Sequence, residues 1–426
     1  MLPKSVKLLL LFMATGLVGA CSTPCGAPGK LCAPISSNTS APPAVMARLP
    51  ERPPEPPPPE AQTYAVAMPD TGTTTGSGFT VGPSLPVVAK EYRIGLMLPL
   101  RSETLGPPAN AVRAGFMAAW ERDRDGFAVT VIETGEAAQD VLAIYAGALE
   151  QQDMIVGPLA RSAVTAIAAS ALVQKPTIAL NHPEARGDTP LPPQMLVIGL
   201  SIEDEARQAA DWAAQEQRGA IALILSGSAP WQRRSASAFG AQWQRLGMAA
   251  KVVEMSVLNG YLSDGELVQL RARLQGEPGT LLFAALDPDQ LRQLRVALAA
   301  PPLSDIPIYG TSSLNPGKSK LQAGPELDGV RLLDLPWQLQ RDHPAVMVYP
   351  QPGAERKFNA DMERLYALGI DAFRVAREVA LHPVSRFNLD GVTGQLQISF
   401  GDGAASFERR ELPAVYKNGV PLPVQP

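Results

Sequence analysis

The sequence has few cysteines, and all of them lie close to its beginning. Cys21, Cys25 and Cys32 are the three cysteines among 426 residues. The chain after residue 32 therefore lacks the thiols that a disulfide, a thiolate nucleophile or a cysteine metal site would need. Cys25 and Cys32 either pair in an oxidising compartment or remain free, and the sequence leaves both alternatives open. Neither alternative affects the main fold, because the loop between them is short.

The sequence also has few histidines and no excess of positive charge. Its formal net charge of −4 excludes the strongly basic surface of proteins that follow nucleic-acid backbones, so we expect no nucleic-acid partner. His182, His343 and His382 are far apart, each stands beside a proline, and they lack the spacing of metal ligands. We therefore expect them in surface loops, and we predict no metal site, no cofactor and no catalytic residues.

The beginning of the chain has the features of an export signal. Two lysines precede an apolar run at residues 8–18, which is too short to span a membrane. We predict that residues 1–20 are a lipoprotein signal peptide and that Cys21 carries the lipid; the alternative is an ordinary signal peptide with a chance cysteine. Ser22, rather than an aspartate, follows the cysteine, which favours the outer membrane. The run ends in a motif that resembles a bacterial lipobox, Leu17-Val18-Gly19-Ala20-Cys21.

Residues 21–90 have the composition of a disordered tether. Residues 52–59 are mostly proline and favour extended polyproline II, and residues 70–78 are rich in glycine and threonine. Neither stretch can bury enough apolar surface to offset the entropy of ordering it. A coil of this length spans about 45 Å, and a fully extended chain reaches on the order of 200 Å. Either span would hold a folded body away from a membrane.

Between residues 91 and 329, strand-length apolar runs alternate with helical patterns. Nearly continuous apolar strands are typical of parallel sheets covered on both faces. A second series begins at Ser201, a candidate N-cap, where Glu203 and Glu205 are expected to complement a helix dipole. The pattern predicts an α/β fold with two doubly wound parallel-sheet lobes joined by multiple crossovers. The expected strands are 93–100, 128–132, 154–159, 176–180, 194–200, 220–225, 251–257, 280–284 and 306–309.

The pattern changes after residue 329. We expect a strand at 330–333, two helices within 354–381 around Gly369, and an antiparallel hairpin of 394–400 and 407–412. Returning segments of this kind indicate that the chain crosses between the lobes more than once. We therefore expect one domain at 91–426, with lobe one at about 91–200 and 330–385, and lobe two at about 201–329 and 386–426.

Polar residues follow several of the expected parallel strands. Ligands of open α/β sheets bind outside the carboxyl ends of the strands, so a cleft there could hold an amino acid or a peptide. No pair of side chains stands out as an anchor for a carboxylate and an ammonium. That absence favours a cleft closed by packing between the lobes. The candidate cleft residues are Ser162, Asn181, Ser226, Ser228 and Thr311.

Several short phrases follow one another in a characteristic order. They are 94–100, 112–116, 157–159, 178–181, 199–206, 309–312, 327–330, 335–337, 364–373 and 391–394. Each phrase alone has low specificity, whereas the ordered series is fairly specific. It resembles the LppC/LpoA family of lipoproteins, which activate penicillin-binding proteins, and it implies a body of the type I periplasmic-binding-protein fold.

The resemblance implies a function. Such lipoproteins sit in the outer membrane, reach through the periplasm and stimulate a class A penicillin-binding protein, a bifunctional peptidoglycan synthase; they are not enzymes. Those relatives carry a large helical-repeat domain where this sequence has the Pro-rich tether, which supplies reach but not that domain's contacts. The alternative is a periplasmic solute-binding lipoprotein for an amino acid or a peptide. An envelope hydrolase would need catalytic residues that the sequence does not offer.

Overall fold

The computed structural model describes residues 91–184, 190–277, 279–317, 324–353 and 358–424. Its contacts divide the chain into two units, residues 1–81 and 82–426, and the described residues all belong to the second. The predicted signal peptide (1–20), the lipid-bearing Cys21, the pairing of Cys25 with Cys32 and the tether (21–90) lie outside the described residues.

Lobe one is built on a parallel sheet with the strand order β2-β1-β3-β4-β5. Successive residues of β1 point to opposite faces, because side chains alternate along a strand. Leu96 packs with α1 and α10, whereas Met97 packs with α2 and α3. The elements are β1 (Tyr92–Leu98), β2 (Phe127–Glu133), β3 (Met154–Val156), β4 (Thr177–Ala179), β5 (Met195–Val197), α1 (Gly106–Arg122), α2 (Ala138–Gln151), α3 (Arg161–Ala168) and α10 (Ala360–Leu381).

Lobe two is built on a larger sheet with the strand order β17-β16-β12-β11-β10-β6-β7. Leu282 of β10 packs with α6 and α7, and Phe283 packs with α4 and α5. Strand β16 runs antiparallel to β12, and β17 runs antiparallel to β16, so β16 alone is reversed in this sheet. The elements are α4 (Ile202–Glu216), β6 (Ile221–Ser226), α5 (Pro230–Arg245), β7 (Ala250–Glu254), α6 (Asp264–Gly276), β10 (Thr280–Ala285), α7 (Pro288–Ala297), β11 (Ile308–Gly310), β12 (Arg331–Asp334), β16 (Leu412–Lys417) and β17 (Val420–Pro423).

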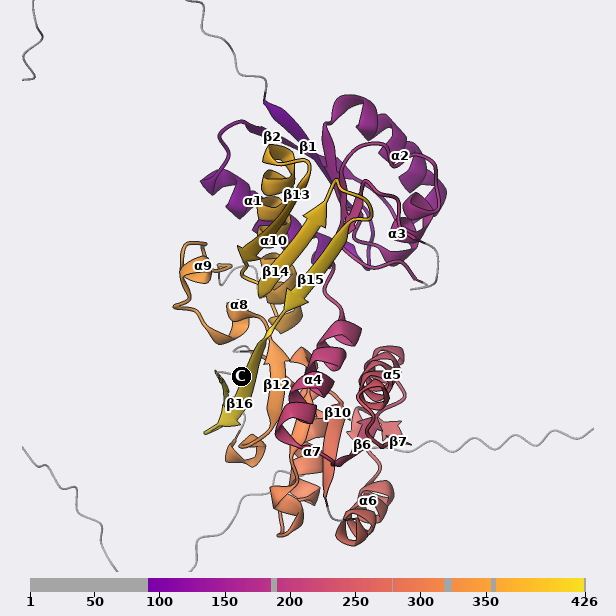
Figure 1. Ribbon diagram of the computed structural model, residues 1–426, viewed down its shortest axis with the longest axis vertical. Helices are drawn as coiled ribbons and strands as arrows, with labels where there is room; N and C mark the ends of the chain where they lie inside the picture. Colours follow the sequence, from indigo (N-terminus) through magenta and orange to yellow (C-terminus); the bar gives the residue numbers. More distant parts are fainter. Residues whose placement is uncertain (1–90, 185–189, 278, 318–323, 354–357, 425–426) are drawn as a thin grey trace, which may run out of the picture. The chain divides into compact units, whose positions relative to one another are not determined.

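Both lobes therefore carry helices on both faces of a largely parallel sheet, and the predicted doubly wound α/β fold is confirmed (Figure 1). The predicted hairpin forms as β14 and β15, and a further strand, β13, completes a small antiparallel sheet. The remaining elements are β8 (Val257–Leu258), β9 (Tyr261–Leu262), η1 (Leu303–Asp305), η2 (Ser312–Leu314), η3 (Pro325–Leu327), α8 (Pro336–Leu339), α9 (Pro344–Met347), β13 (Ser385–Asp390), β14 (Gln395–Phe400) and β15 (Ser406–Arg410).

The prediction of two helices around Gly369 is wrong, because α10 runs through this residue without a break. Gly369 instead lets α10 cross α1 closely. A Cβ at Gly369 would lie 2.1 Å from the carbonyl oxygen of Val112, and a Cβ at Gly115 would lie 1.8 Å from that of Tyr366. Each glycine thus faces the backbone of the opposite helix, and both are required by the approach of the two helices.

The expected lobe ranges need two corrections. Strand β12 pairs with β11 and β16, so residues 331–334 belong to lobe two rather than lobe one. The sheet β13-β14-β15 packs on the core of lobe one through Leu396, Ile398 and Phe400, so its residues do not belong to lobe two. Alternating apolar residues show that a strand has a buried face, but they do not say which core covers it. The chain crosses between lobes near residues 200, 335 and 411 (Figure 1).

Candidate functional site

A cavity of about 360 Å³ lies where the two lobes meet. Lobe one contributes the loop after β4 and the first turns of α3 and α10, and lobe two contributes the first turn of α4, part of α5 and η2. This is the edge at which parallel strands end, so the position agrees with the rule for ligand sites in α/β sheets. The lining residues are Arg161, Asn181, His182, Leu200, Ile202, Glu203, Glu205, Arg234, Ser312, Asp361, Arg364 and Leu365.

Of the five predicted cleft residues, Asn181 lines this cavity. Its side-chain amide donates to the carbonyl oxygen of Leu159 at 3.0 Å, and its amide oxygen accepts from the backbone N–H of His182 at 2.9 Å. The side chain of Asn181 therefore already has partners within its own lobe, where it connects the loops that follow β3 and β4.

The other four predicted residues do not line the cavity. Ser162 lies next to the lining residue Arg161, in the first turn of α3. Thr311 is fully buried, and its hydroxyl lies 2.9 Å from that of Ser313. Ser226 is buried at the end of β6, and Ser228 is exposed. The predicted loops at Ser162, Asn181 and Thr311 each have a residue in the lining or next to a lining residue, whereas the loop of Ser226 and Ser228 contributes none.

The cavity is far more charged than the sequence analysis expected. Arg234 and Glu203 form an ion pair at 2.8 Å on its lobe-two side. Glu205, which was expected to complement a helix dipole, is instead 5% exposed and accepts a hydrogen bond from the backbone N–H of Ser312 at 2.9 Å. The N-cap prediction is confirmed, because the hydroxyl of Ser201 accepts from the N–H of Asp204.

Arg364 is the central cation of the junction between the lobes. Its guanidinium donates to both carboxylate oxygens of Asp334, at 3.0 and 2.8 Å. It also donates to the carbonyl oxygens of Ser312 and Asn315, at 2.9 and 3.0 Å. Asp334 is fully buried and accepts further bonds from the side chain of Asn315 and the N–H of Leu335. A side chain of lobe one thus holds two segments of lobe two.

A second buried cation, Arg409, lies at the crossover from β15 to β16. It donates to the carbonyl oxygens of Ile198 and Gly199, at 2.8 and 3.0 Å, and to the hydroxyl of Thr393. The same hydroxyl donates to the buried carboxylate of Asp371 at 2.7 Å. These bonds connect the crossover near residue 200 to the crossover near residue 411.

Burial changes the titration of the carboxylates at this junction. Desolvation raises the pKa of Glu205 to about 7, and the nearby charge of Asp334 adds to this rise while Ser312 and Arg364 oppose it. Desolvation, together with the charge of Glu205, also raises the pKa of Glu411 well above its ordinary value. Glu411 is 7% exposed, and its Oε2 has no hydrogen-bond partner. A buried carboxyl without a hydrogen-bond donor, like that of Glu411, is more stable in its neutral, protonated form.

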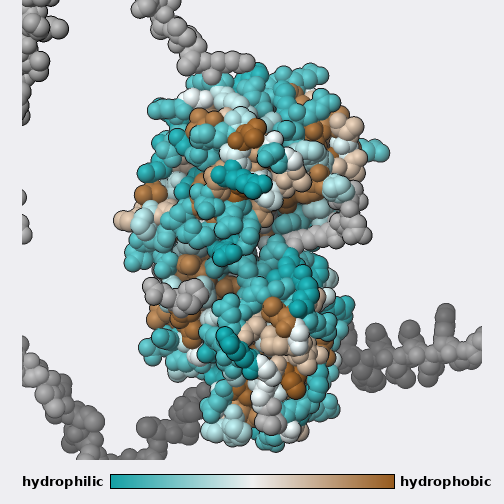
Figure 2. Space-filling view, viewed as in Figure 1, coloured by the Kyte–Doolittle hydropathy of each residue, from teal (hydrophilic) through white to brown (hydrophobic). Residues whose placement is uncertain are grey.

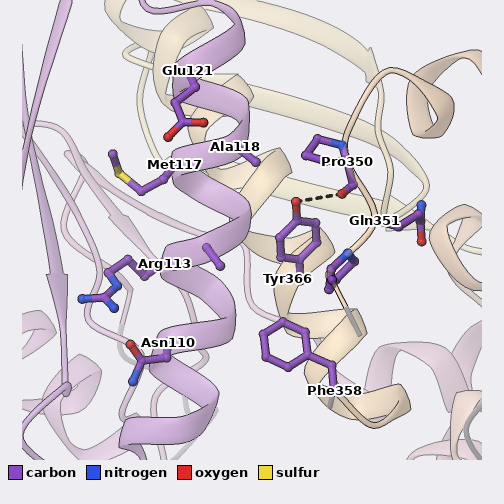
Figure 3. A pocket seen from close by; sticks show the side chains of 12 residues that line it. Asn110, Arg113, Met117, Ala118, Glu121, Pro350, Gln351, Phe358 and Tyr366 are labelled. Carbon is purple, nitrogen blue, oxygen red and sulfur yellow. Dashed lines mark hydrogen bonds between the residues drawn. The ribbon is translucent and has the colours of Figure 1, made fainter. Parts of the chain in front are cut away.

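A larger cavity, of about 750 Å³, lies on lobe one, away from the junction. It is bordered by one face of α1 and by the segment that leads into α10, with Phe358 and Tyr366 opposite the helix (Figure 3). The hydroxyl of Tyr366 donates to the carbonyl oxygen of Pro350 at 2.9 Å. The lining mixes apolar groups with the charged side chains of Arg113 and Glu121.

The histidines occupy separate places. His343 caps α9 by accepting from the N–H of Ala345, His182 lies 3.9 Å from Asp204, and His382 is largely exposed. Across the described ranges, no group of three or more His, Cys, Asp and Glu side chains is arranged to hold a metal ion. In the same part of the chain, no helix combines the length and apolar character needed to cross a bilayer.

Comparison with known proteins gives two kinds of relative. The penicillin-binding protein activator LpoA of Yersinia pseudotuberculosis is 27% identical over 319 residues, which cover 64% of this chain and 47% of that protein. This chain therefore spans about half the length of the curated relatives that it matches. The LpoA (YraM) C-domain from Haemophilus influenzae, a regulator of PBP1A, has a TM-score of 0.62 at 24% identity, covering 78% of this chain and 100% of that one.

A second solved structure resembles the chain to a similar degree. It is a putative branched-chain amino acid ABC transporter from Chromobacterium violaceum, with a TM-score of 0.61 at 32% identity, covering 76% of this chain and 100% of that one. Both neighbours agree with the predicted binding-protein-like fold. The model of the family described as LppC putative lipoprotein matches residues 87–410, which include nearly all of both lobes. The chain therefore belongs to the LppC family.

Proposed function

We propose that this chain is a non-enzymatic regulator that binds and activates a class A penicillin-binding protein, and so promotes peptidoglycan synthesis. The observation that carries the proposal is the family match over residues 87–410, together with relatives that are named penicillin-binding protein activators. The matched region includes nearly all of the two-lobed body, so the body is the part that we expect to contact the synthase.

The geometry of the cavity between the lobes supports a role in contact rather than in capturing a ligand. The amide of Asn181 is bonded within its own lobe, and Arg364 is bonded to Asp334 and to two backbone carbonyls. A ligand would have to displace these bonds, and buried polar groups left without partners are costly. Hydrophilic side chains cover most of the face shown in Figure 2, with apolar ones scattered among them; a non-obligate interface needs no more apolar surface than this.

The proposal includes attachment to the outer membrane on its periplasmic side. The lipobox-like motif before Cys21 supports cleavage at that residue and lipidation of its side chain. The tether of residues 21–90 then spans about 45 Å as a coil and on the order of 200 Å when extended. A body on such a tether can reach a synthase that is anchored in the opposite membrane.

Binding is tested with the purified full-length chain and a class A penicillin-binding protein from the same cell. We expect the immobilised chain to retain this synthase, and to retain no monofunctional transpeptidase. Failure to retain any class A synthase contradicts the proposal.

The likeness to the Chromobacterium violaceum protein supports a second candidate function, a solute-binding lipoprotein for an amino acid or a peptide. Thermal-shift measurements with branched-chain amino acids, other amino acids and muropeptides separate the two. A regulator should give shifts below about 1 °C with all of them, whereas a solute-binding protein should give a large, saturable shift with one.

A further inference from the structure

Five charged side chains are buried together where the chain crosses between the lobes, and we call them the junction cluster: Glu205, Asp334, Arg364, Arg409 and Glu411. Each is less than a tenth exposed. Glu205 comes from α4, Asp334 ends β12, Arg364 lies in α10, and Arg409 and Glu411 flank the crossover from β15 to β16. The cluster holds three carboxylates and two guanidinium groups, so it carries an excess of one negative charge when every group is ionised.

The hydrogen bonds are distributed unequally among the three carboxylates. Asp334 accepts four, including both bonds from Arg364. Glu205 accepts from the backbone N–H of Ser312, and the buried Oε2 of Glu411 accepts from no group. Because a buried carboxylate needs donors or a proton, Glu205 and Glu411 are the two groups that gain from protonation.

These two carboxylates lie beside different cavities at the junction. Glu205 lines the cavity of about 360 Å³, and Glu411 lines a neighbouring cavity of about 280 Å³, which is bordered by α4, α5 and β15. An ionised carboxylate is stabilised by water, but Glu205 and Glu411 are each less than a tenth exposed. Full hydration of their ionised forms therefore needs the two cavities to widen, which would separate the segments that the crossovers hold together.

We propose that Glu205 and Glu411 form a proton-binding site that controls the junction between the lobes: protonation holds the crossovers in the arrangement seen here, and release of the proton to solvent loosens them. The charged groups that act on this site from the surrounding elements are Asp334, Asp361, Arg364, Asp371 and Arg409. His182 lines both cavities, and the other titratable or charged residues that line one of them are Arg161, Glu203, Asp204, Arg207, Asp211, Arg234, Arg245 and Glu408. The site would make the relative position of the lobes depend on pH, and it does not depend on the identity of any partner.

The first experiment is a ¹³C-carboxyl titration of the full-length chain. We expect a glutamate resonance that titrates near pH 7 and is missing in Glu205→Gln. If all glutamate carboxyls titrate below about pH 5, the site does not exist as proposed. This measurement on the wild-type chain remains informative even if a variant folds poorly.

The second experiment is amide hydrogen exchange at pH 6.0 and pH 8.5, corrected for the intrinsic exchange rate. With a pKa of about 7 in the closed form and about 4.5 in the open form, opening of the junction should increase about tenfold between these pH values. The amides to follow are those at the crossovers, Ser312, Leu335, Thr393 and Glu411.

The variant Glu205→Gln/Glu411→Gln has neutral side chains of nearly the same shape and should lose most of this pH dependence. The matched control is Glu254→Gln, since Glu254 is an exposed partner of Arg233 on lobe two; it should keep the wild-type behaviour. Equal pH dependence in the double variant and the wild type would overturn the proposal, as would a change spread evenly over all amides.

Discussion

Arg364 and Asp334 illustrate how single residues hold this molecule together. Their guanidinium and carboxylate are joined by two hydrogen bonds in a site where Arg364 is 6% exposed and Asp334 is fully buried. Removing one partner of a buried pair leaves the other charge without compensation, which typically costs 3–5 kcal/mol. The pair therefore constrains the structure strongly even though its net contribution to stability is small.

We predict that Asp334→Ala lowers the free energy of unfolding by about 3–5 kcal/mol. Equilibrium urea denaturation of the full-length chain measures this change. The control is Glu408→Ala, because Glu408 pairs with Arg410 in an exposed ion pair at 3.3 Å and should contribute less than about 1 kcal/mol. Similar losses in the two variants would show that burial at the junction has no special energetic role.

Glu205 makes stability depend on pH. Its pKa is about 7 in the folded chain, above its ordinary value of 4.5, so the folded state binds more protons than the unfolded state between these values. The contribution of Glu205 to the free energy of unfolding should therefore be greatest below about pH 4.5. It should fall by about 3 kcal/mol as the pH rises to 7 and above.

Urea denaturation of wild type and Glu205→Gln at several pH values between 5 and 8 measures this contribution. The decline with rising pH should be smaller in Glu205→Gln, because glutamine does not ionise. If the free energy of unfolding changed equally with pH in the wild type and in Glu205→Gln over this interval, the assignment would be contradicted.

The junction residues also show what a sequence cannot reveal at this scale. Arg364 stands inside one of the family phrases, but its partner is 30 positions earlier and in a different lobe. Glu205 follows the N-cap of a helix, where an acidic residue is usually solvated, but here it is buried and bonded to the N–H of Ser312, 107 positions later. Long-range pairing of this kind depends on the topology and leaves no local pattern.

The contact between helices α1 and α10 leaves no room for a side chain at two positions. Gly115 and Gly369 each face backbone of the other helix, so a methyl group at either position would collide with a carbonyl group rather than with a side chain that can move. We predict that Gly115→Ala lowers the free energy of unfolding by about 1–3 kcal/mol or more, since a packed backbone must shift.

The matched control is Gly147→Ala in α2, where an added Cβ would meet no atom within 4 Å. Here alanine should raise the stability by about 0.5–1 kcal/mol, because it is the better helix former. Thermal or urea unfolding of the two variants distinguishes them by sign. Stabilisation by both substitutions would show that the crossing of α1 and α10 is looser than described.

At the scale of elements, most strands and helices could be predicted because each buried strand is a nearly continuous apolar run, as at residues 154–156 and 280–285. The prediction failed where one residue had a tertiary role. Gly369 looked like a helix break, but it is required by the close approach of α1, where Val112 lies far earlier in the chain. Likewise β12 and β13 were assigned to the wrong lobes because their patterns do not specify a partner sheet.

At the scale of the whole molecule, we propose that a lipid anchor and a tether hold the two-lobed body at the membrane. We predict that Cys21→Ala abolishes incorporation of labelled palmitate and releases the chain from the membrane fraction. The control is Cys25→Ala, which should keep the label and the membrane association. Retention of the label in Cys21→Ala would contradict anchoring at this cysteine.

The central claim is that the full-length chain activates a class A penicillin-binding protein. The most direct measurement is the initial rate of glycan polymerisation and peptide crosslinking by the purified synthase as this chain is added. We predict a saturable rise in the rate of one or both reactions, and no activity of the chain alone. Unchanged rates at concentrations that saturate binding would contradict it.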